Sequence, residues 1–216
     1  MIEPYYSDDH CTIYHGDCRD ILPALPTPDL LLADPPYGIA IETDSSSRSR
    51  RSLGINHPPV HGDDEPFDPS HLLGASRRVV LFGANNYCDK LPPSQAWIVW
   101  DRMSGGSNTA DAELAWTNLG GTVRTFRHLW NGVLRDSEIG FHVHPTQKPV
   151  RLMSWVIARA TSDGDLVIDP YCGSGPTLRA AKDLGRKAIG IEIEERYCEI
   201  AVKRLQQSVM RLEVPA

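Results

Sequence analysis

Apolar residues along this chain gather in short runs, and polar segments with helical periodicity separate them. The run from Leu30 to Ala33 leaves no polar position on either side of the strand it would form. Such two-sided burial is typical of a parallel sheet that helices cover on both faces. Six segments follow this pattern and are predicted to be strands: 11–15, 29–33, 78–82, 96–100, 166–168 and 188–193.

Two later segments, 150–160 and 194–209, place their apolar side chains three and four residues apart, which predicts amphipathic helices. A further helix is predicted at 177–184, between them. Pro149 suits a helix start, and Gly185 suits the end of the second helix. Strands that alternate with helices in this way predict an α/β fold with a doubly wound sheet.

Length and composition indicate one globular domain spanning 1–216. The chain has 216 residues, 41% hydrophobic and 23% charged. A membrane span needs about 20 consecutive apolar residues, and no such stretch is present. The first residues, MIEPYYSDDH, lack the basic and apolar regions of a signal peptide, so we expect a cytoplasmic protein that does not contact membranes. Residues 42–69, rich in Ser, Arg, Pro and His, are expected to form one long surface loop.

Charge and cysteine content bear on two kinds of site, metal sites and nucleic-acid contacts. None of the five cysteines has CxxC spacing, which predicts buried free thiols and no zinc or other metal site. The net charge of −6 is unusual for a general nucleic-acid binder, so any DNA contact must use local basic clusters. The candidates are Arg48, Arg50 and Arg51 in the long loop and Arg124 and Arg127 further along.

The segment DLVIDPYCGSGPT, residues 165–177, reads as a strand, a glycine-rich turn and a helix start. This arrangement is typical of a nucleotide-binding crevice at the carboxyl end of a strand. Glu192 ends the next predicted strand, 23 residues after Asp169, where a carboxylate can accept ribose hydroxyls. A plain turn with a helix-capping acid is the alternative, and the four features together favour the crevice.

The segment DPPYG, residues 34–38, directly follows the predicted strand 29–33. Two prolines make a rigid extended corner. This corner can present the Asp34 carboxylate, a backbone carbonyl and the Tyr37 ring at one point, which suits an amino group on a flat ring. The alternative is a turn in which Tyr37 only packs on the core.

The third segment, HPTQKP, occupies residues 144–149 before the helix 150–160. Thr146 is a candidate cap for that helix. Lys148 places a cation at the helix start, where the helix dipole disfavours it, so we expect an anionic partner. A capping turn with a solvated lysine is the alternative.

Together and in this order, the three segments resemble the amino-group DNA methyltransferases that use S-adenosylmethionine. DPPYG is similar to their catalytic motif, DPYCGSGPT to their cofactor motif and HPTQKP to their lysine motif. The catalytic motif precedes the cofactor motif, which resembles the circularly permuted β-group. Weaker blocks such as DAELAW, residues 111–116, match in the same order, so the resemblance covers nearly the whole chain. The loop GSGPT departs from the usual GSGTT at Pro176.

The resemblance implies a mostly parallel, seven-stranded, Rossmann-like methyltransferase sheet in permuted order. It implies a short target-recognition region at 103–142 and S-adenosylmethionine as cofactor. It also implies roles for particular residues. The catalytic residues would be Asp34, Pro35, Pro36 and Tyr37. The cofactor-binding residues would be Asp17, Lys148, Asp169, Pro170, Tyr171, Gly173, Ser174, Gly175, Thr177 and Glu192.

The implied activity is methyl transfer to an exocyclic amino group of double-stranded DNA, with adenine N6 favoured by the DPPY form of the motif. Cytosine N4 is the first alternative. Amino methylation of RNA or protein and a non-catalytic DNA-binding accessory role are the others. A homodimer, a cognate restriction nuclease and a restriction–modification role stay open.

Overall fold

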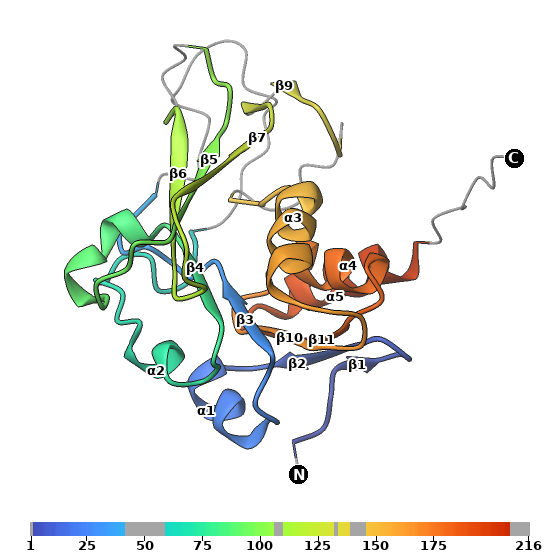
Figure 1. Ribbon diagram of the computed structural model, residues 1–216. Coiled ribbons are helices and arrows are strands. Elements are labelled where there is room, and N and C mark those ends of the chain that lie inside the picture. The colour runs from blue at the N-terminus through green and yellow to red at the C-terminus, as the bar shows by residue number, and fades with distance from the viewer. Residues whose placement is uncertain (1, 42–58, 106–109, 132–133, 139–145, 208–216) are drawn as a thin grey trace, which may run out of the picture.

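The computed structural model describes residues 2–41, 59–105, 110–131, 134–138 and 146–207 (Figure 1). Within these residues, one sheet has the strand order β1-β2-β11-β10-β3-β4-β6-β5-β7. Its strands are β1 (Tyr6–Ser7), β2 (Cys11–His15), β3 (Leu30–Ala33), β4 (Val79–Phe82), β5 (Trp97–Asp101), β6 (Ala112–Thr117), β7 (Arg124–Arg127), β10 (Leu166–Asp169) and β11 (Lys187–Glu192). A separate two-stranded ribbon joins β8 (Trp130–Asn131) and β9 (Leu134–Arg135).

The centre of the sheet is parallel, from β2 through β11, β10 and β3 to β4. β6 runs antiparallel between β4 and β5, and β1 runs antiparallel along β2. From the centre, the chain passes from β10 to β11 on one side and from β3 to β4 on the other. The strand order therefore reverses between β10 and β3, which is where doubly wound sheets bind ligands.

Two layers of helices cover the sheet. Figure 1 shows α3 (Val150–Ala160), α4 (Pro176–Asp183) and α5 (Glu195–Gln206) on one side, and α1 (Cys18–Ile21) and α2 (Ser70–Leu73) on the other. Short 3₁₀ turns η1 (Leu22–Ala24), η3 (Ala84–Asn86) and η4 (Cys88–Lys90) complete the connections.

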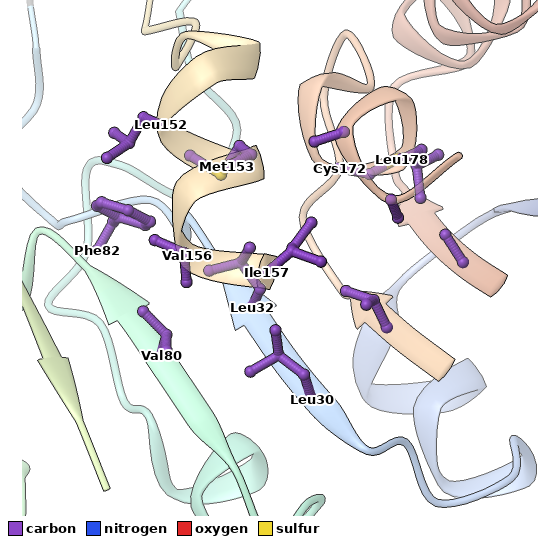
Figure 2. Close-up of a cluster of buried hydrophobic side chains, with 14 of the residues drawn as sticks. Leu30, Leu32, Val80, Phe82, Leu152, Met153, Val156, Ile157, Cys172 and Leu178 are labelled. Carbon is purple, nitrogen blue, oxygen red and sulfur yellow. The ribbon is translucent and has the colours of Figure 1, made fainter. Parts of the chain in front are cut away.

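The buried strands alternate between the two layers, as period-two side chains must. Leu30 and Leu32 of β3 face the cluster that contains Ile157 of α3 (Figure 2), whereas Leu31 and Ala33 belong to the cluster on the opposite face. Every residue of β3 is buried. The run 30–33 is therefore wholly apolar because both faces of β3 are buried, as the sequence predicted.

The predicted α/β, doubly wound, mostly parallel class is confirmed, and so is the permuted order. All six predicted strands occur, each within one residue of its expected bounds, and the helix 150–160 is confirmed. The sheet has nine strands rather than seven because β1 and β7 extend its two edges. The helix expected at 194–209 ends earlier, at Gln206. β6 was not predicted from the sequence, although it completes the sheet between β4 and β5.

Four cysteines are buried free thiols as predicted: Cys11, Cys18, Cys172 and Cys198. The same prediction is wrong for Cys88, which is exposed. Within the described residues, no helix combines the length and the apolar character that crossing a membrane requires.

Gly190 of β11 provides a test of how closely α4 packs on the sheet. A Cβ there would lie 2.8 Å from both Cys172 Sγ and Leu178 Cδ1. We expect Gly190→Ala to lower the free energy of unfolding by about 1–3 kcal/mol through overpacking. Gly74→Ala is the matched control because a Cβ at Gly74 meets nothing within 4 Å. Urea unfolding measures both variants, and equal stabilities would contradict the close packing.

Candidate active site

Four acidic residues lie at the ends of four neighbouring parallel strands. Asp17 follows β2, Glu192 ends β11, Asp169 ends β10 and Asp34 follows β3. Since β2, β11, β10 and β3 are adjacent and parallel, their carboxyl ends meet at one edge of the sheet. The sequence motifs 34–38 and 165–177 are therefore brought together at the point where the strand order reverses.

Lys148 joins the third motif to the first. Its ammonium nitrogen lies 2.8 Å from both carboxylate oxygens of Asp34 and 3.1 Å from Glu113 Oε2. The Tyr37 hydroxyl donates to Asp34 Oδ1 at 2.5 Å and accepts from Lys148 at 3.0 Å. The Lys148 side chain is 3% exposed. The anionic partners expected for this lysine are thus carboxylates of the chain itself, in this structure.

Burial and the close opposite charges together set the pKa values in this cluster. Burial raises the pKa of Asp34, and the nearby Glu113 carboxylate acts in the same direction, while Lys148 opposes both. Burial alone would lower the pKa of Lys148, but the two carboxylates outweigh it and raise that pKa. Burial and the same two carboxylates also raise the pKa of Tyr37. Lys148 is therefore charged, Tyr37 is a neutral hydrogen-bond donor, and two carboxyl groups face one ammonium.

The Tyr37 ring is positioned by a glycine on the neighbouring strand. Gly83 directly follows β4 with a φ of +67°, and a Cβ there would lie 2.0 Å from Tyr37 Cε1. The ring therefore covers the backbone of Gly83, which only glycine permits. The Lys148 ammonium lies 5.4 Å from the centroid of the Tyr37 ring and 5.8 Å from that of Phe82, within cation–π range.

The glycine-rich turn after β10 is tied to β11 by Glu192. Glu192 Oε2 accepts from the Gly173 amide at 2.8 Å, and Oε1 accepts from the Glu194 amide at 2.8 Å. Burial raises the pKa of Glu192, and these amide hydrogen bonds oppose that rise. Gly175 precedes α4 with a φ of +78°, and Pro176 occupies the first turn as predicted.

Asp169 is a buried carboxyl at this edge whose pKa is shifted far upward. Its side chain is buried, and it accepts from the Tyr171 amide at 3.0 Å. Burial raises the pKa of Asp169 to about 7, although hydrogen bonds from Thr177 and the Tyr171 amide act against the shift. A buried carboxyl with a pKa near neutrality, at a sheet edge, is typical of functional sites.

The remaining predicted cofactor residues lie in the turn after β10, at the start of α4 or, for Asp17, after β2. Asp17 caps α1 by accepting from the Arg19 amide at 2.8 Å. The Tyr171 hydroxyl lies 2.9 Å from Nε2 of His71, a residue of α2, so a hydrogen bond to this helix holds the tyrosine. Pro170, Ser174 and Thr177 are buried within the turn and the start of α4. Their roles toward a cofactor stay predictions.

The predicted cap on α3 is wrong. Pro149, not Thr146, occupies the N-cap position, and no side chain of the cap residue closes the helix. The Val150 amide instead donates to Glu138 Oε2 at 2.9 Å. Arg204 of α5 donates to Glu138 Oε1 at 2.6 Å, so this acid joins two helices. The Glu138 carboxylate therefore accepts from the first amide of α3, where the sequence predicted a cap by the Thr146 hydroxyl.

Three residues that shape the site were not singled out from the sequence: Glu113, Gly83 and Asp63. Glu113 is an acid inside a mostly apolar strand, and Gly83 directly follows a buried strand, so a signal was present for both. Asp63 has no such signal because it lies among similar polar residues. It is nevertheless buried and accepts several backbone amides.

The predicted DNA-contacting arginines are only partly described. Arg48, Arg50 and Arg51 lie outside the described residues. Arg124 and Arg127 lie on β7, an edge strand of the sheet, and both are exposed. Arg127 Nε donates to Asp101 Oδ2 at 2.9 Å, so part of its charge is compensated.

Comparison with known proteins agrees with this geometry. Residues 82–203 match the family model N6_N4_Mtase, described as DNA methylase, and the chain belongs to this family. It is 43% identical to the type II methyltransferase M2.DpnII of Streptococcus pneumoniae over 84 residues, which is 38% of this chain and 31% of that enzyme. It is 26% identical to M.HinfI of Haemophilus influenzae over 264 residues, covering 96% of this chain and 71% of that enzyme. The match to M2.DpnII thus spans about a third of its length.

Solved structures share the fold. The M1.HpyAVI–SAM complex has a TM-score of 0.58 and 25% identity, with 90% of this chain and all of that chain covered. The cytosine-N4-specific PvuII DNA methyltransferase has a TM-score of 0.62 at 15% identity, covering 96% of this chain and 90% of that one, which shows a common fold alone.

Asp169 provides a pH-dependent test of the site. Its folded pKa of about 7 lies above the ordinary value of 3.8, so its neutral form favours the folded state. That contribution is fully present below about pH 4 and is lost as pH rises through about 7. Asp169→Asn stays neutral. Its stability relative to wild type should therefore increase by roughly 2–3 kcal/mol between pH 5 and pH 8.

Urea unfolding at the two pH values measures this difference. Asp89→Asn, at an exposed position in η4, is the control for the replacement of an aspartate by asparagine. A stability difference between Asp169→Asn and wild type that does not vary with pH would contradict the shifted pKa.

Proposed function

We propose that this chain is an S-adenosylmethionine-dependent DNA methyltransferase that methylates an exocyclic amino group, with adenine N6 as the target. One observation carries the proposal. Asp34 follows β3 and Asp169 ends β10, two adjacent parallel strands between which the strand order reverses. A target amine at Asp34 and a cofactor at the turn after β10 would therefore share one crevice.

The turn after β10 fits the methionine and ribose parts of such a cofactor. Gly173 has a φ of +49° and Gly175 a φ of +78°, so the backbone bends as side-chain-bearing residues rarely do. Glu192 lies beside Gly173 and retains acceptor capacity for ribose hydroxyls, since each carboxylate oxygen accepts two hydrogen bonds. By the resemblance Lys148 would hold the cofactor carboxylate, which would require its ammonium to give up a contact with Asp34 or Glu113. Asp17 would lie on the adenine side. Bound there, S-adenosylmethionine supplies an electrophilic methyl group on its sulfonium.

Asp34 would activate the target. An exocyclic amine is a poor nucleophile because its lone pair is delocalised into the ring. The Asp34 carboxylate and the Pro35 carbonyl would accept its two hydrogens and favour a tetrahedral nitrogen with developing positive charge. As the amine takes the methyl group, the carbon–sulfur bond of the sulfonium would break and leave a neutral thioether. The amine would then lose one proton, which the Asp34 carboxylate would accept. Burial raises the pKa of Asp34, which improves it as a proton acceptor.

Tyr37 would form one wall of the base site. Its ring is held on one side by the Gly83 backbone, and its hydroxyl is fixed by Asp34 and Lys148. A ring held in this way can stack on a base extruded from the duplex. Double-stranded DNA is therefore the proposed substrate. The choice of adenine over cytosine rests on the DPPY form of the motif.

Transfer of a radiolabelled methyl group tests the function directly. The full chain is incubated with labelled cofactor and unmodified duplex DNA, RNA or protein, and the DNA is digested to nucleosides. Label in N6-methyladenine is expected. Label in N4-methylcytosine would replace adenine by cytosine, and label confined to RNA or protein would overturn the DNA substrate. Label in none of them favours a non-catalytic accessory role.

Asp34→Ala tests the assigned chemistry. We expect methyl transfer to fall by about 10²–10³-fold because the variant lacks a preorganised acceptor of the target amine. Cofactor affinity, measured by calorimetry, should stay close to that of wild type. Asp64→Ala, at an exposed position, is the control for the removed negative charge. Wild-type turnover in Asp34→Ala would refute the role of this carboxylate.

Arg124 and Arg127 test the proposed DNA surface. Removing one arginine–phosphate interaction should lower the slope of log affinity against log salt by about 0.9. We expect the double alanine variant to bind duplex DNA more weakly, with a flatter salt dependence and unchanged cofactor affinity. Replacing Arg48, Arg50 and Arg51 together should have the same effect. Lys203→Ala on α5, where the side chain is 72% exposed, is the control. An unchanged slope in both arginine variants would place the DNA surface elsewhere.

A further inference from the structure

Asp63 holds the DPPYG loop, here defined as residues 34–41. Every backbone amide from residue 37 to residue 41 donates to this one aspartate. Four of them reach its carboxylate: Oδ1 accepts from Tyr37 at 2.8 Å, Gly38 at 2.9 Å and Ile39 at 3.4 Å, and Oδ2 accepts from Ile41 at 2.8 Å. The Ala40 amide donates to the main-chain carbonyl of Asp63 at 2.7 Å.

The loop that Asp63 holds has an unfavourable backbone conformation. Gly38 has a φ of +74°, and a Cβ there would lie 2.5 Å from the carbonyl oxygen of Glu65. Ala40 has a φ of +48°, in the left-handed region that residues with a side chain rarely adopt. Such a conformation persists only where the surroundings impose it. The contacts from residues 63–65 impose it here.

Burial makes these hydrogen bonds strong and mutually dependent. Asp63 is 4% exposed, and a buried carboxylate requires several donors. Hydrogen bonds to an ionised acceptor are about twice as strong as neutral ones. The loop amides satisfy the carboxylate, and the carboxylate satisfies amides that do not pair within a helix or strand.

We propose that Asp63 is a positioning residue for methyl transfer, which it serves by fixing the Pro35 carbonyl and the Tyr37 ring relative to Asp34. The inference rests on the proposed function and deepens it. The amide of Tyr37 is held by Asp63, and its hydroxyl is held by Asp34 and Lys148. Tyr37 is therefore fixed at both ends of its length.

The connection to the Pro35 carbonyl follows from the covalent chain. Peptide bonds are planar, and the proline rings fix φ at residues 35 and 36. Only the ψ angle of Pro36 separates the anchored Tyr37 amide from the Pro35 carbonyl. A shift of the loop at Tyr37 therefore moves an acceptor of the target amine.

Two substitutions at Asp63 and one adjacent control test the proposal in the full chain. Asp63→Ala removes the carboxylate. Asp63→Asn can retain Oδ1 with its three amides but turns an NH₂ group toward the Ile41 amide. Asp64→Ala removes the neighbouring carboxylate, which is exposed.

The first readout separates kcat from KM in methyl transfer to duplex DNA. A misplaced reacting group costs about 10²-fold in rate, so we expect kcat to fall by that factor in Asp63→Ala, with a cofactor KM within about twofold of wild type. Asp63→Asn should recover part of the loss, with kcat about tenfold below wild type, because three of four amides keep an acceptor. Asp64→Ala should match wild type.

The second readout does not depend on activity. Hydrogen–deuterium exchange of the peptide that spans 37–41 should be at least about tenfold faster in Asp63→Ala than in Asp64→Ala. If wild type transfers no methyl group to DNA, the proposed function fails, and the exchange rates alone decide whether Asp63 orders the loop.

Several results would overturn the positioning role. The first is a kcat for Asp63→Ala within about threefold of that for Asp64→Ala. Unchanged hydrogen–deuterium exchange of residues 37–41 would also overturn it. So would a cofactor KM that rises by the same factor as kcat falls. If Asp63→Ala does not fold, Asp63→Asn decides in its place. Failure of both variants to fold would assign Asp63 a purely structural role.

Discussion

The burial of the Lys148 ammonium constrains the rest of the site. A charge that is 3% exposed is stable only with close partners, and Asp34 and Glu113 supply them. These partners come from the end of β3 and from β6, while Lys148 itself lies just before α3. One ion cluster therefore sets the distances between three parts of the chain, and the DPPYG loop, β6 and α3 cannot move independently without leaving a buried charge unpaired.

Carboxylates also hold two irregular segments of the chain. In each segment, one carboxylate accepts hydrogen bonds from several backbone amides. Glu192 holds the turn after β10, and Asp63 holds the DPPYG loop. In both cases an acceptor-only group satisfies donors that no helix or strand pairs. Both turns are thereby held by hydrogen bonds from side-chain carboxylates, and fixed groups of this kind are what a site needs if it is to stabilise charge as a reaction develops.

Sequence patterns predicted the parts of this structure that depend on local periodicity or on short motifs. The strand 29–33 was recognisable because both of its faces are buried, and the turn 169–175 because glycines and flanking acids lie at fixed spacing. β6 was missed since Glu113 interrupts its apolar pattern. Asp63 was missed because its burial depends on contacts with residues more than 20 positions away, and nothing nearby distinguishes it from Asp64. The cap of α3 was wrong because Glu138, outside the segment 144–149 that was considered, accepts from the Val150 amide.

The permuted order of the motifs has a consequence for how the chain assembles during synthesis. β3 is made early, yet its neighbour in the centre of the sheet, β10, follows far later: the Leu166 amide bonds to Asp29, 137 residues away. β2 likewise pairs with β11, which is translated much later. Until these central strands emerge from the ribosome, β2 and β3 expose unpaired edges, which are templates for aggregation. Pairings this distant in sequence also close slowly. Nascent chains of this protein are therefore expected to depend on chaperones more than a chain in which the central strands are translated first.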